Sequence, residues 1–278
     1  MRIARFSRDD TVAYGVVQES VPDGVASAAI GPDTDGLTIA ELQGHPFGVG
    51  TDSVRYTGQS YPVADVRLLA PVLPTKVVAI GKNYADHARE MGGEPPDEPV
   101  IFLKPSTSVI GPGDPVARPV KLSERVDFEG ELAVVIGRLC RDVPPERVSE
   151  VIFGYTCAND VTARDAQKAE KQWARAKGFD SSCPIGPWIE TGLDLAAAND
   201  LAVTATVNGE LRQSGRTSQM IRSIEDLIVH ISEAMTLLPG DVILTGTPAG
   251  VGPLNVGDEV AVTIEGIGTL TNKVVKRG

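Results

Sequence analysis

The chain has 278 residues, of which 42% are hydrophobic and 23% are charged, an ordinary balance for a globular protein with a sizeable core. Its formal net charge of −11 argues against non-specific binding to nucleic acid or to an anionic membrane surface. An anionic substrate would therefore need local help from a metal ion or from a few basic residues.

Three features of the sequence also predict the cellular compartment. No apolar run approaches the roughly 18 residues of a membrane span, and the N-terminal residues lack the apolar core of a secretory signal. The cysteines Cys140, Cys157 and Cys183 form no CxxC pair, and an odd count without framework spacing suits a reduced protein. We therefore expect a cytoplasmic protein that has no membrane or nucleic-acid partner.

The N-terminal part, residues 1–70, is predicted to form a small antiparallel β module. Apolar stretches separated by turn residues predict strands near residues 2–7, 12–18, 35–42, 54–59 and 64–72. The two prolines of PVLPTK, residues 71–76, mark a joint, so that residues 71–278 form the second domain. No motif in the module points to chemistry.

The second domain begins with a buried type of strand, VVAIG (77–81), and a short helix, NYADHAREM (83–91), which is followed by a Gly/Pro-rich segment. YTCANDVTARD (155–165) predicts a strand that runs into a turn, and the polar residues 166–180 favour a helical segment.

A hairpin and a longer helix follow. Asn208-Gly209 is a turn signal in the middle of residues 201–215. The apolar residues of 223–241 keep the 3.6-residue period, which predicts a helix that is capped by Ser223 and ends at Pro239-Gly240. Strands outnumber helices, so the predicted class is α+β and β-rich.

The stretch RVDFEGELAVVIG (125–137) predicts a strand with an unusual acidic face. Side chains two apart share a face, so those of Asp127, Glu129 and Glu131 lie together and are continued by apolar residues. Buried carboxylates repel one another unless a cation lies between them, and Mg²⁺, Mn²⁺ and Ca²⁺ prefer oxygen ligands. The alternative is a solvated edge strand whose charges prevent aggregation, and the strand alone does not decide between the two.

Other residues could take part in catalysis or binding, but each also has a purely structural interpretation. His87 and Glu90, at i and i+3, share a helix face, where a carboxylate orients an imidazole as a general base; a surface pair is the alternative. Asp160 ends an apolar strand and is also a typical turn residue. Lys177 precedes a glycine and is either a catalytic cation or a surface lysine.

The glycine-rich TGTPAGVG (245–252) lacks the Lys-Ser/Thr of a phosphate loop and does not open a helix. We predict instead a tight loop that lines a pocket and offers the hydroxyl of Thr245 or Thr247.

Seven segments in this order resemble the fumarylacetoacetate hydrolase superfamily. They cover the chain from about residue 70 to its end, and are VVAIGKNYADHAREM, PVIFLKPSTSVIGPGDPV, VDFEGELAVVIG, GYTCANDVTARDAQ, AKGFDSSCPIGPWI, VNGELRQSGRTSQMI and MTLLPGDVILTGTPAGVGPL. The resemblance implies a mixed β-roll or sandwich core with short helices, and a homodimer. Residues 1–70 resemble no family that we name from the sequence.

The resemblance implies metal ligands at Glu129, Glu131 and Asp160, with Asp127 just behind them. The implied cation is Mg²⁺ or Mn²⁺, with Ca²⁺ as a substitute. A small anionic 2-oxo acid would chelate the cation through its keto oxygen and one carboxylate oxygen. The cation would stabilise an enolate as a Lewis acid.

The resemblance also implies the groups that surround the substrate. The implied catalytic residues are His87, Glu90 and Lys177, and the implied substrate-binding residues are Gln167, Arg164 and Thr247. His87 paired with Glu90 would activate water or shuttle a proton.

The expected activity is the metal-dependent hydrolytic cleavage of a C–C bond in 2,4-dioxo acids of the acylpyruvate or fumarylpyruvate type. Two alternatives use the same site: isomerisation of 2-hydroxyhepta-2,4-diene-1,7-dioate in aromatic catabolism, and decarboxylation of oxaloacetate. A third alternative, from a different class, is a non-catalytic protein that binds 2-oxo acids.

Overall fold

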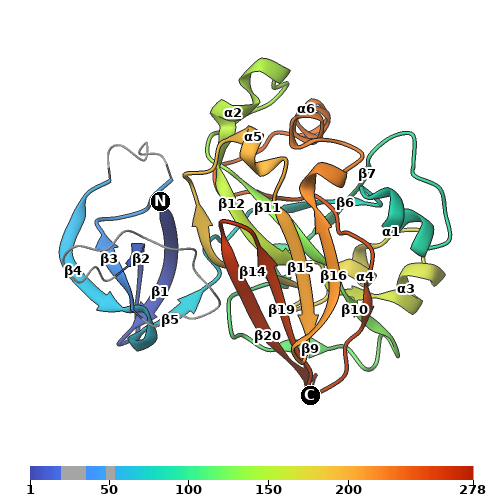
Figure 1. Cartoon of the computed structure of the whole chain (residues 1–278), viewed down its shortest axis with the longest axis horizontal. Coiled ribbons are helices and arrows are strands. Elements are labelled where there is room, and N and C mark those ends of the chain that lie inside the picture. The colour runs from blue at the N-terminus through green and yellow to red at the C-terminus, as the bar shows by residue number, and fades with distance from the viewer. Residues whose placement is uncertain (20–35, 48–53, 278) are drawn as a thin grey trace.

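The computed structural model of the chain describes residues 1–19, 36–47 and 54–277 (Figure 1). Its N-terminal residues form antiparallel strands, which we call the N-terminal module. The strands in chain order are β1 (Arg2–Arg8), β2 (Thr11–Glu19), β3 (Leu37–Leu42), β4 (Tyr56–Pro62) and β5 (Arg67–Leu69). Asp35, with which the third predicted strand begins, lies outside the described residues.

The module continues into a larger sheet, because β1 pairs in antiparallel fashion with β14, with Ile3 opposite Ile189. Among the described strands, this sheet runs in the order β4-β3-β2-β1-β14-β12-β11-β17-β6-β7. Its remaining members are β14 (Cys183–Glu190), β12 (Ile152–Asn159), β11 (Gly130–Ile136), β17 (Val242–Leu244), β6 (Val77–Gly81), β7 (Val100–Lys104) and, paired with β14, β8 (Val109–Ile110).

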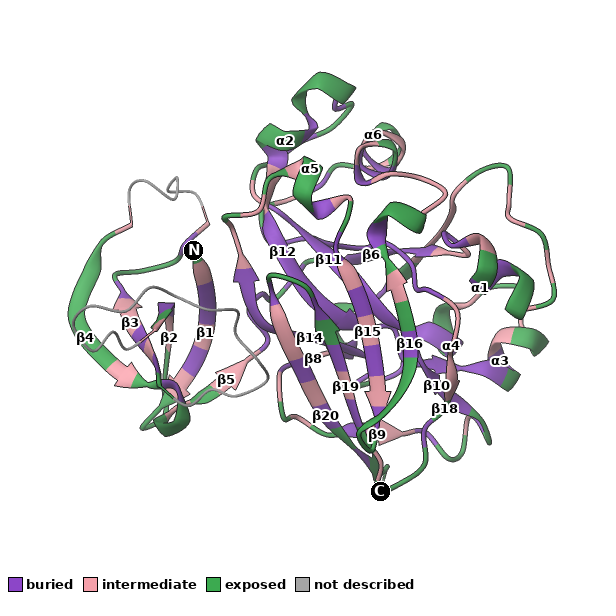
Figure 2. Cartoon of the chain, viewed as in Figure 1, coloured by how far each residue is buried: buried purple, intermediate pink, exposed green. Residues whose placement is uncertain are grey.

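A second sheet, in the order β16-β15-β19-β20-β9, packs against the first. Leu132 and Val134 of β11 share one buried cluster with Val203 and Val262 of the second sheet. The strands of the second sheet are β15 (Ala202–Val207), β16 (Glu210–Arg216), β19 (Glu259–Ile264), β20 (Gly268–Lys276) and β9 (Val116–Arg118). Figure 2 shows the buried residues concentrated where the two sheets meet. The α+β, β-rich class with a sandwich-like core is confirmed.

The helices are short and lie around the sheets (Figure 1). They are α1 (Ala85–Glu90), α2 (Val148–Val151), α3 (Arg164–Ala169), α4 (Ala174–Lys177), α5 (Leu195–Ala198) and α6 (Ile224–Ala234). The polar segment 166–180 therefore holds two separate short helices. None of the described helices has the length and apolar character that crossing a membrane requires.

The longest of these helices, α6, begins as predicted and ends early. The hydroxyl of Ser223 accepts the backbone N–H of Asp226, which caps the helix. Met235 is already extended, with φ −151°, so the expected continuation to residue 238 is wrong. Leu237 instead forms a β-bridge with Cys140, and this contact overrides the helical period.

The acidic stretch is not one continuous strand, which corrects our expectation. It divides at Glu129 into β10 (Val126–Phe128) and β11. β10 belongs to a small sheet with β13 (Thr162–Ala163) and β18 (Gly252–Pro253), whereas β11 lies between β12 and β17 in the larger sheet. Residues 126–136 are all buried, so the alternative of a solvated edge strand is wrong.

Candidate metal centre and active site

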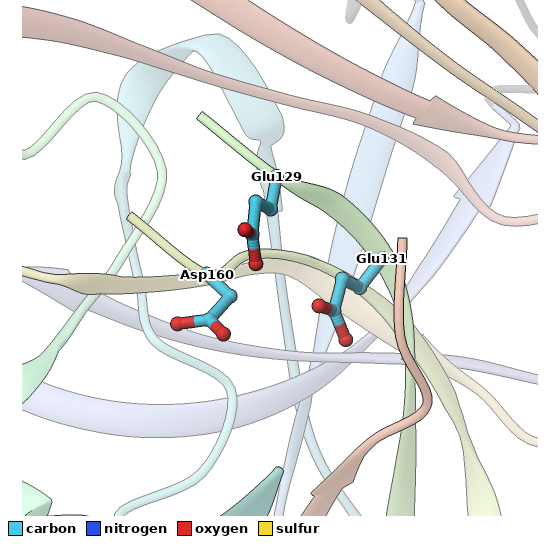
Figure 3. A group of neighbouring side chains, drawn as sticks. All are labelled: Glu129, Glu131 and Asp160. Atoms are coloured by element: carbon cyan, nitrogen blue, oxygen red, sulfur yellow. The ribbon is translucent and has the colours of Figure 1, made fainter. Parts of the chain in front are cut away.

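Three buried carboxylates meet where the acidic stretch changes sheets (Figure 3). Glu129, Glu131 and Asp160 each present an oxygen, and these oxygens lie within 4.8 Å of one another. Glu131 lies at the start of β11, and Asp160 directly follows β12, the strand paired with β11. The backbone N–H of Asp160 donates to the carbonyl of Glu129 at 2.8 Å, which holds the two segments together.

The cluster fits a divalent cation. Burial raises the pKa of Glu131 well above its ordinary value, and the charges of Asp160 and Glu129 raise it further. A bound cation would remove this penalty, and a set of three carboxylates is the oxygen donor set that hard divalent cations prefer. The backbone N–H of Gly246 donates to Glu131 at 2.7 Å and fixes this carboxylate.

Two lysines are buried against the same carboxylates. Lys177 Nζ lies 2.7 Å from an oxygen of Glu129 and 2.7 Å from an oxygen of Asp160. Lys104 Nζ lies 2.6 Å from the other oxygen of Asp160. Burial lowers the pKa of Lys177, but the negative charges of Asp160 and Glu129 outweigh burial and leave the pKa raised. Lys177 is therefore a charged ammonium group in the centre of the site.

Arg164 completes this set of cations. Its Nη2 forms an ion pair of 2.5 Å with Glu129, although no hydrogen bond of Nη2 has good geometry. Burial disfavours the ionised form of Glu129, but Lys177 and Arg164 outweigh burial and hold the pKa of Glu129 below its ordinary value. Arg164 Nε donates at 2.8 Å to Asp127, which Arg125 also binds. Asp127 therefore lies behind the cluster and orients Arg164.

An imidazole on α1 faces the same cavity, and a carboxylate of α1 lies behind it. His87 Nδ1 lies 3.3 Å from Glu90 Oε2, and the side chain of His87 is only 6% exposed. Glu90 also accepts the backbone N–H of Gly250, at 3.1 and 3.2 Å to its two oxygens. The loop 245–252 therefore holds both Glu131 and Glu90, and it lines a pocket as the sequence predicts.

The cavity has a volume of about 170 Å³. It brings together seven of the nine residues that the resemblance implied: His87, Glu129, Glu131, Arg164, Gln167, Lys177 and Thr247. The other two lie behind this lining, since Glu90 contacts His87 and Asp160 contacts Lys177.

Two polar side chains of the cavity wall are already oriented by the protein. Gln167 accepts a hydrogen bond from Arg164 at 3.0 Å, which leaves its amide N–H groups for a ligand. Thr247 donates to the carbonyl of Gly130 at 2.8 Å and accepts from Gln213 at 2.7 Å. The hydroxyl proton of Thr247 is therefore committed within the protein.

The sequence reading missed Lys104, Gln213 and Trp173. The sequence did indicate Lys104, because a lysine inside the apolar run VIFLKP either pairs with a buried anion or points to solvent. Gln213 is fully buried and accepts the backbone N–H of Gly130 at 2.9 Å. Trp173 lines the cavity and lies edge-on to Phe102, with ring centroids 5.4 Å apart.

Comparison with known proteins identifies relatives of both parts of the chain. The fumarylacetoacetate (FAA) hydrolase C-terminal family matches residues 76–275, and an N-terminal family described as Rv2993c-like matches residues 1–71. Protein Rv2993c of Mycobacterium tuberculosis is 56% identical over 260 residues, which are 92% of this chain and 96% of that protein. Oxaloacetate tautomerase YisK of Bacillus subtilis is 45% identical, over 77% of this chain and 75% of that protein.

A solved structure has the same fold over the full length. The 2-hydroxyhepta-2,4-diene-1,7-dioate isomerase from Mycobacterium marinum matches with a TM-score of 0.87 and 48% identity, over 100% of this chain and 99% of that one.

Proposed function

Because the chain belongs to the fumarylacetoacetate hydrolase family, we propose that it is a divalent-metal-dependent enzyme that interconverts the keto and enol forms of an oxaloacetate-like 2-oxo acid. One observation carries the proposal: an imidazole oriented by a carboxylate and a buried cluster of three carboxylates open into one cavity. Enolisation needs a base for the proton on C3 and positive charge near the 2-oxo oxygen. The names of the tautomerase and isomerase relatives point in the same direction.

Glu129, Glu131 and Asp160 would hold the cation, for which Mg²⁺ or Mn²⁺ is the proposed identity and Ca²⁺ a substitute. When bound, such a cation acts as a Lewis acid toward a 2-oxo acid.

His87 is the proposed base. Its Nδ1 faces Glu90, so the other ring nitrogen, Nε2, is the one that is free to take the C3 proton. Glu90 stabilises the imidazolium ion that results, and Gly250 keeps Glu90 in place.

Lys177 is the proposed donor to the substrate oxygen. An ammonium group has three N–H bonds, and those of Lys177 that point to Glu129 and Asp160 leave one for the substrate. The negative charge that develops on the 2-oxo oxygen is stabilised by this N–H. Gln167 adds an amide donor on the neighbouring wall.

Hydrolytic C–C cleavage, the activity expected from the sequence, is the second candidate. The His87–Glu90 pair favours it, because the same nitrogen can take a proton from water. Hydroxide then adds to the distal carbonyl carbon, the C–C bond breaks, and its electron pair forms the enolate of the 2-oxo acid. Oxaloacetate decarboxylation uses the same enolate without the water.

Proton exchange distinguishes these activities. We expect purified protein with Mg²⁺ to accelerate exchange of the C3 protons of oxaloacetate in D₂O, followed by ¹H NMR, and EDTA to abolish the acceleration. Acetylpyruvate cleaved to acetate and pyruvate would establish the hydrolase instead. Release of CO₂ would establish the decarboxylase. Binding of 2-oxo acids without any of these reactions would contradict the proposal and support a binding protein.

A further inference from the structure

Lys82 has a backbone conformation that is uncommon for a lysine. It lies between β6 and α1, and its φ is +58°, in the left-handed region. This conformation is sterically unfavourable for a residue with a Cβ. Strain of this kind clusters at functional sites, where the surrounding structure maintains it.

Lys82 is one of the residues that line the active-site cavity. Lys82 lines this cavity together with His87 and Thr247. Its Nζ lies beside Gly93, in the segment that follows α1: a Cβ added at Gly93 would lie 3.1 Å from it. The absence of a side chain at Gly93 makes room for the ammonium group.

Lys82 also differs from the buried cations Lys177 and Arg164 of the cavity in its ion pairs. Lys177 and Arg164 are committed to carboxylates of the acidic cluster. Lys82 forms neither an ion pair nor a side-chain hydrogen bond with any of the described residues, and it is partly buried. A half-buried ammonium group without a protein partner is a site for an anionic group of a ligand.

We propose that Lys82 binds the carboxylate at the far end of a dicarboxylic 2-oxo acid, so that the enzyme selects dianions over monoanions of the same length. This inference rests on the proposed function, because it places the 2-oxo carboxylate at the acidic cluster and the second carboxylate away from it.

The composition of the cavity wall supports this assignment. The acidic cluster attracts a 2-oxo acid only through the cation that it holds, and it repels a second carboxylate. Ile80, Met91 and Trp173 offer no donor of that strength to an anion. Lys168 also lines the cavity but is exposed, where water screens its charge. Lys82 is therefore the group that can compensate the second charge.

The test compares oxaloacetate with acetylpyruvate, in which an acetyl group replaces the far carboxylate. For each, kcat/KM for enolisation is measured with the wild-type enzyme and with Lys82→Met. A charge-assisted hydrogen bond corresponds to a discrimination of about 10- to 100-fold. We expect the ratio of oxaloacetate to acetylpyruvate to fall by this factor, mainly through KM for oxaloacetate, and Lys82→Arg to restore most of it.

Two further variants separate this role from a folding defect. Lys82→Asn suits the left-handed conformation and should lose the discrimination as Lys82→Met does. Lys273→Met removes an exposed charge on β20 and should keep the wild-type ratio. An unchanged ratio in both Lys82→Met and Lys82→Asn would overturn the inference.

Calorimetry gives a readout that does not depend on turnover. With Mg²⁺ present, 2-oxoglutarate and 2-oxovalerate, which differ in the far carboxylate, are titrated into each variant. We expect Lys82→Met to weaken binding of 2-oxoglutarate alone. If the wild-type protein turns over neither oxaloacetate nor acetylpyruvate, but Lys82→Met selectively weakens binding of 2-oxoglutarate, the proposed function fails and the role of Lys82 stands. If turnover is normal and both ligands bind Lys82→Met as they bind the wild type, the role of Lys82 fails.

Discussion

Lys104 Nζ lies 2.6 Å from Asp160 Oδ1, and both side chains are at most 1% exposed. Lys104→Met leaves Lys177 as the remaining cation at the buried Asp160, so the free energy of unfolding should fall, by at most the roughly 3 to 5 kcal/mol that an uncompensated buried charge costs. Urea denaturation in EDTA measures this loss. Lys273→Met, which removes an exposed lysine, should leave the midpoint unchanged, and an equally unchanged midpoint for Lys104→Met would contradict the importance of the pair.

Glu131→Gln should have opposite effects on metal affinity and on the stability of the metal-free protein. Loss of a residue that hydrogen-bonds to a metal ligand lowers metal affinity by about 10- to 100-fold. Loss of a ligand itself should therefore weaken Mn²⁺ binding by at least about 100-fold. The same change removes the repulsion from Asp160 and Glu129, so the melting temperature in EDTA should rise. Calorimetric titration and thermal melts measure the two effects. Glu124→Gln, at an exposed position, should change neither.

His87→Gln should lower kcat without affecting the metal site. A positioned general base contributes about 10²- to 10⁴-fold, and we expect a loss in this range for C3 proton exchange. Glu90→Gln keeps the contact but removes the charge that stabilises the imidazolium ion, so its loss should be smaller. Mn²⁺ affinity should stay at the wild-type value in both variants. Wild-type exchange by His87→Gln would assign the base to another residue.

Gly250→Ala and Gly257→Ala form a matched pair that isolates a close contact. Both glycines have φ near +100° (+103° and +98°), so both variants strain the backbone. A Cβ at Gly257 meets nothing within 4 Å, and this variant should cost about 1 to 2 kcal/mol. A Cβ at Gly250 would lie 2.1 Å from the carbonyl oxygen of Arg212. Gly250→Ala should therefore unfold at a clearly lower urea concentration than Gly257→Ala. Because the backbone N–H of Gly250 donates to Glu90, Gly250→Ala should also lower kcat.

Asp241 should make the stability of the protein dependent on pH in the acidic range. Burial opposes ionisation of Asp241, but hydrogen bonds from Lys76, Thr75 and the backbone of Leu238 outweigh burial and lower its pKa. Such a carboxyl stabilises the fold above its unfolded pKa of about 3.9, and this contribution is lost as the pH falls toward the lower folded pKa. Asp241→Asn should therefore be less stable than the wild type at pH 6, and the difference should shrink between pH 5 and 3. Asp10→Asn, at an exposed position, serves as the control.

Local patterns predicted the hairpin at Asn208-Gly209 and the Ser223 cap because both depend on residues that are close in the chain. The division of the acidic stretch was not predictable in this way. Alternation of side chains continues across Glu129, whereas the break depends on Asn159, whose side chain accepts the backbone N–H of Glu129 at 3.0 Å. The role of Lys104 was not predictable for the same reason, because its partner Asp160 lies 56 residues further along the chain.

The candidate site was predicted from the resemblance rather than from spacing. The three proposed metal ligands do come together, and His87, which Glu90 contacts, faces the same cavity as Lys177. The distribution of cations among the carboxylates depends on tertiary packing and was not expected. The homodimer and the boundary near residue 70 stay predictions.

The pairing of β1 with β14 has a consequence for the order of folding. A ribosome adds Ile189, the neighbour of Ile3, 186 positions after Ile3. At about 5 to 20 residues per second, β1 therefore waits roughly 10 to 40 s for this partner. Of the described strands that pair with β1, β2 and β5 are close in sequence and are synthesised before β14, so the N-terminal module forms first and joins the larger sheet late in synthesis.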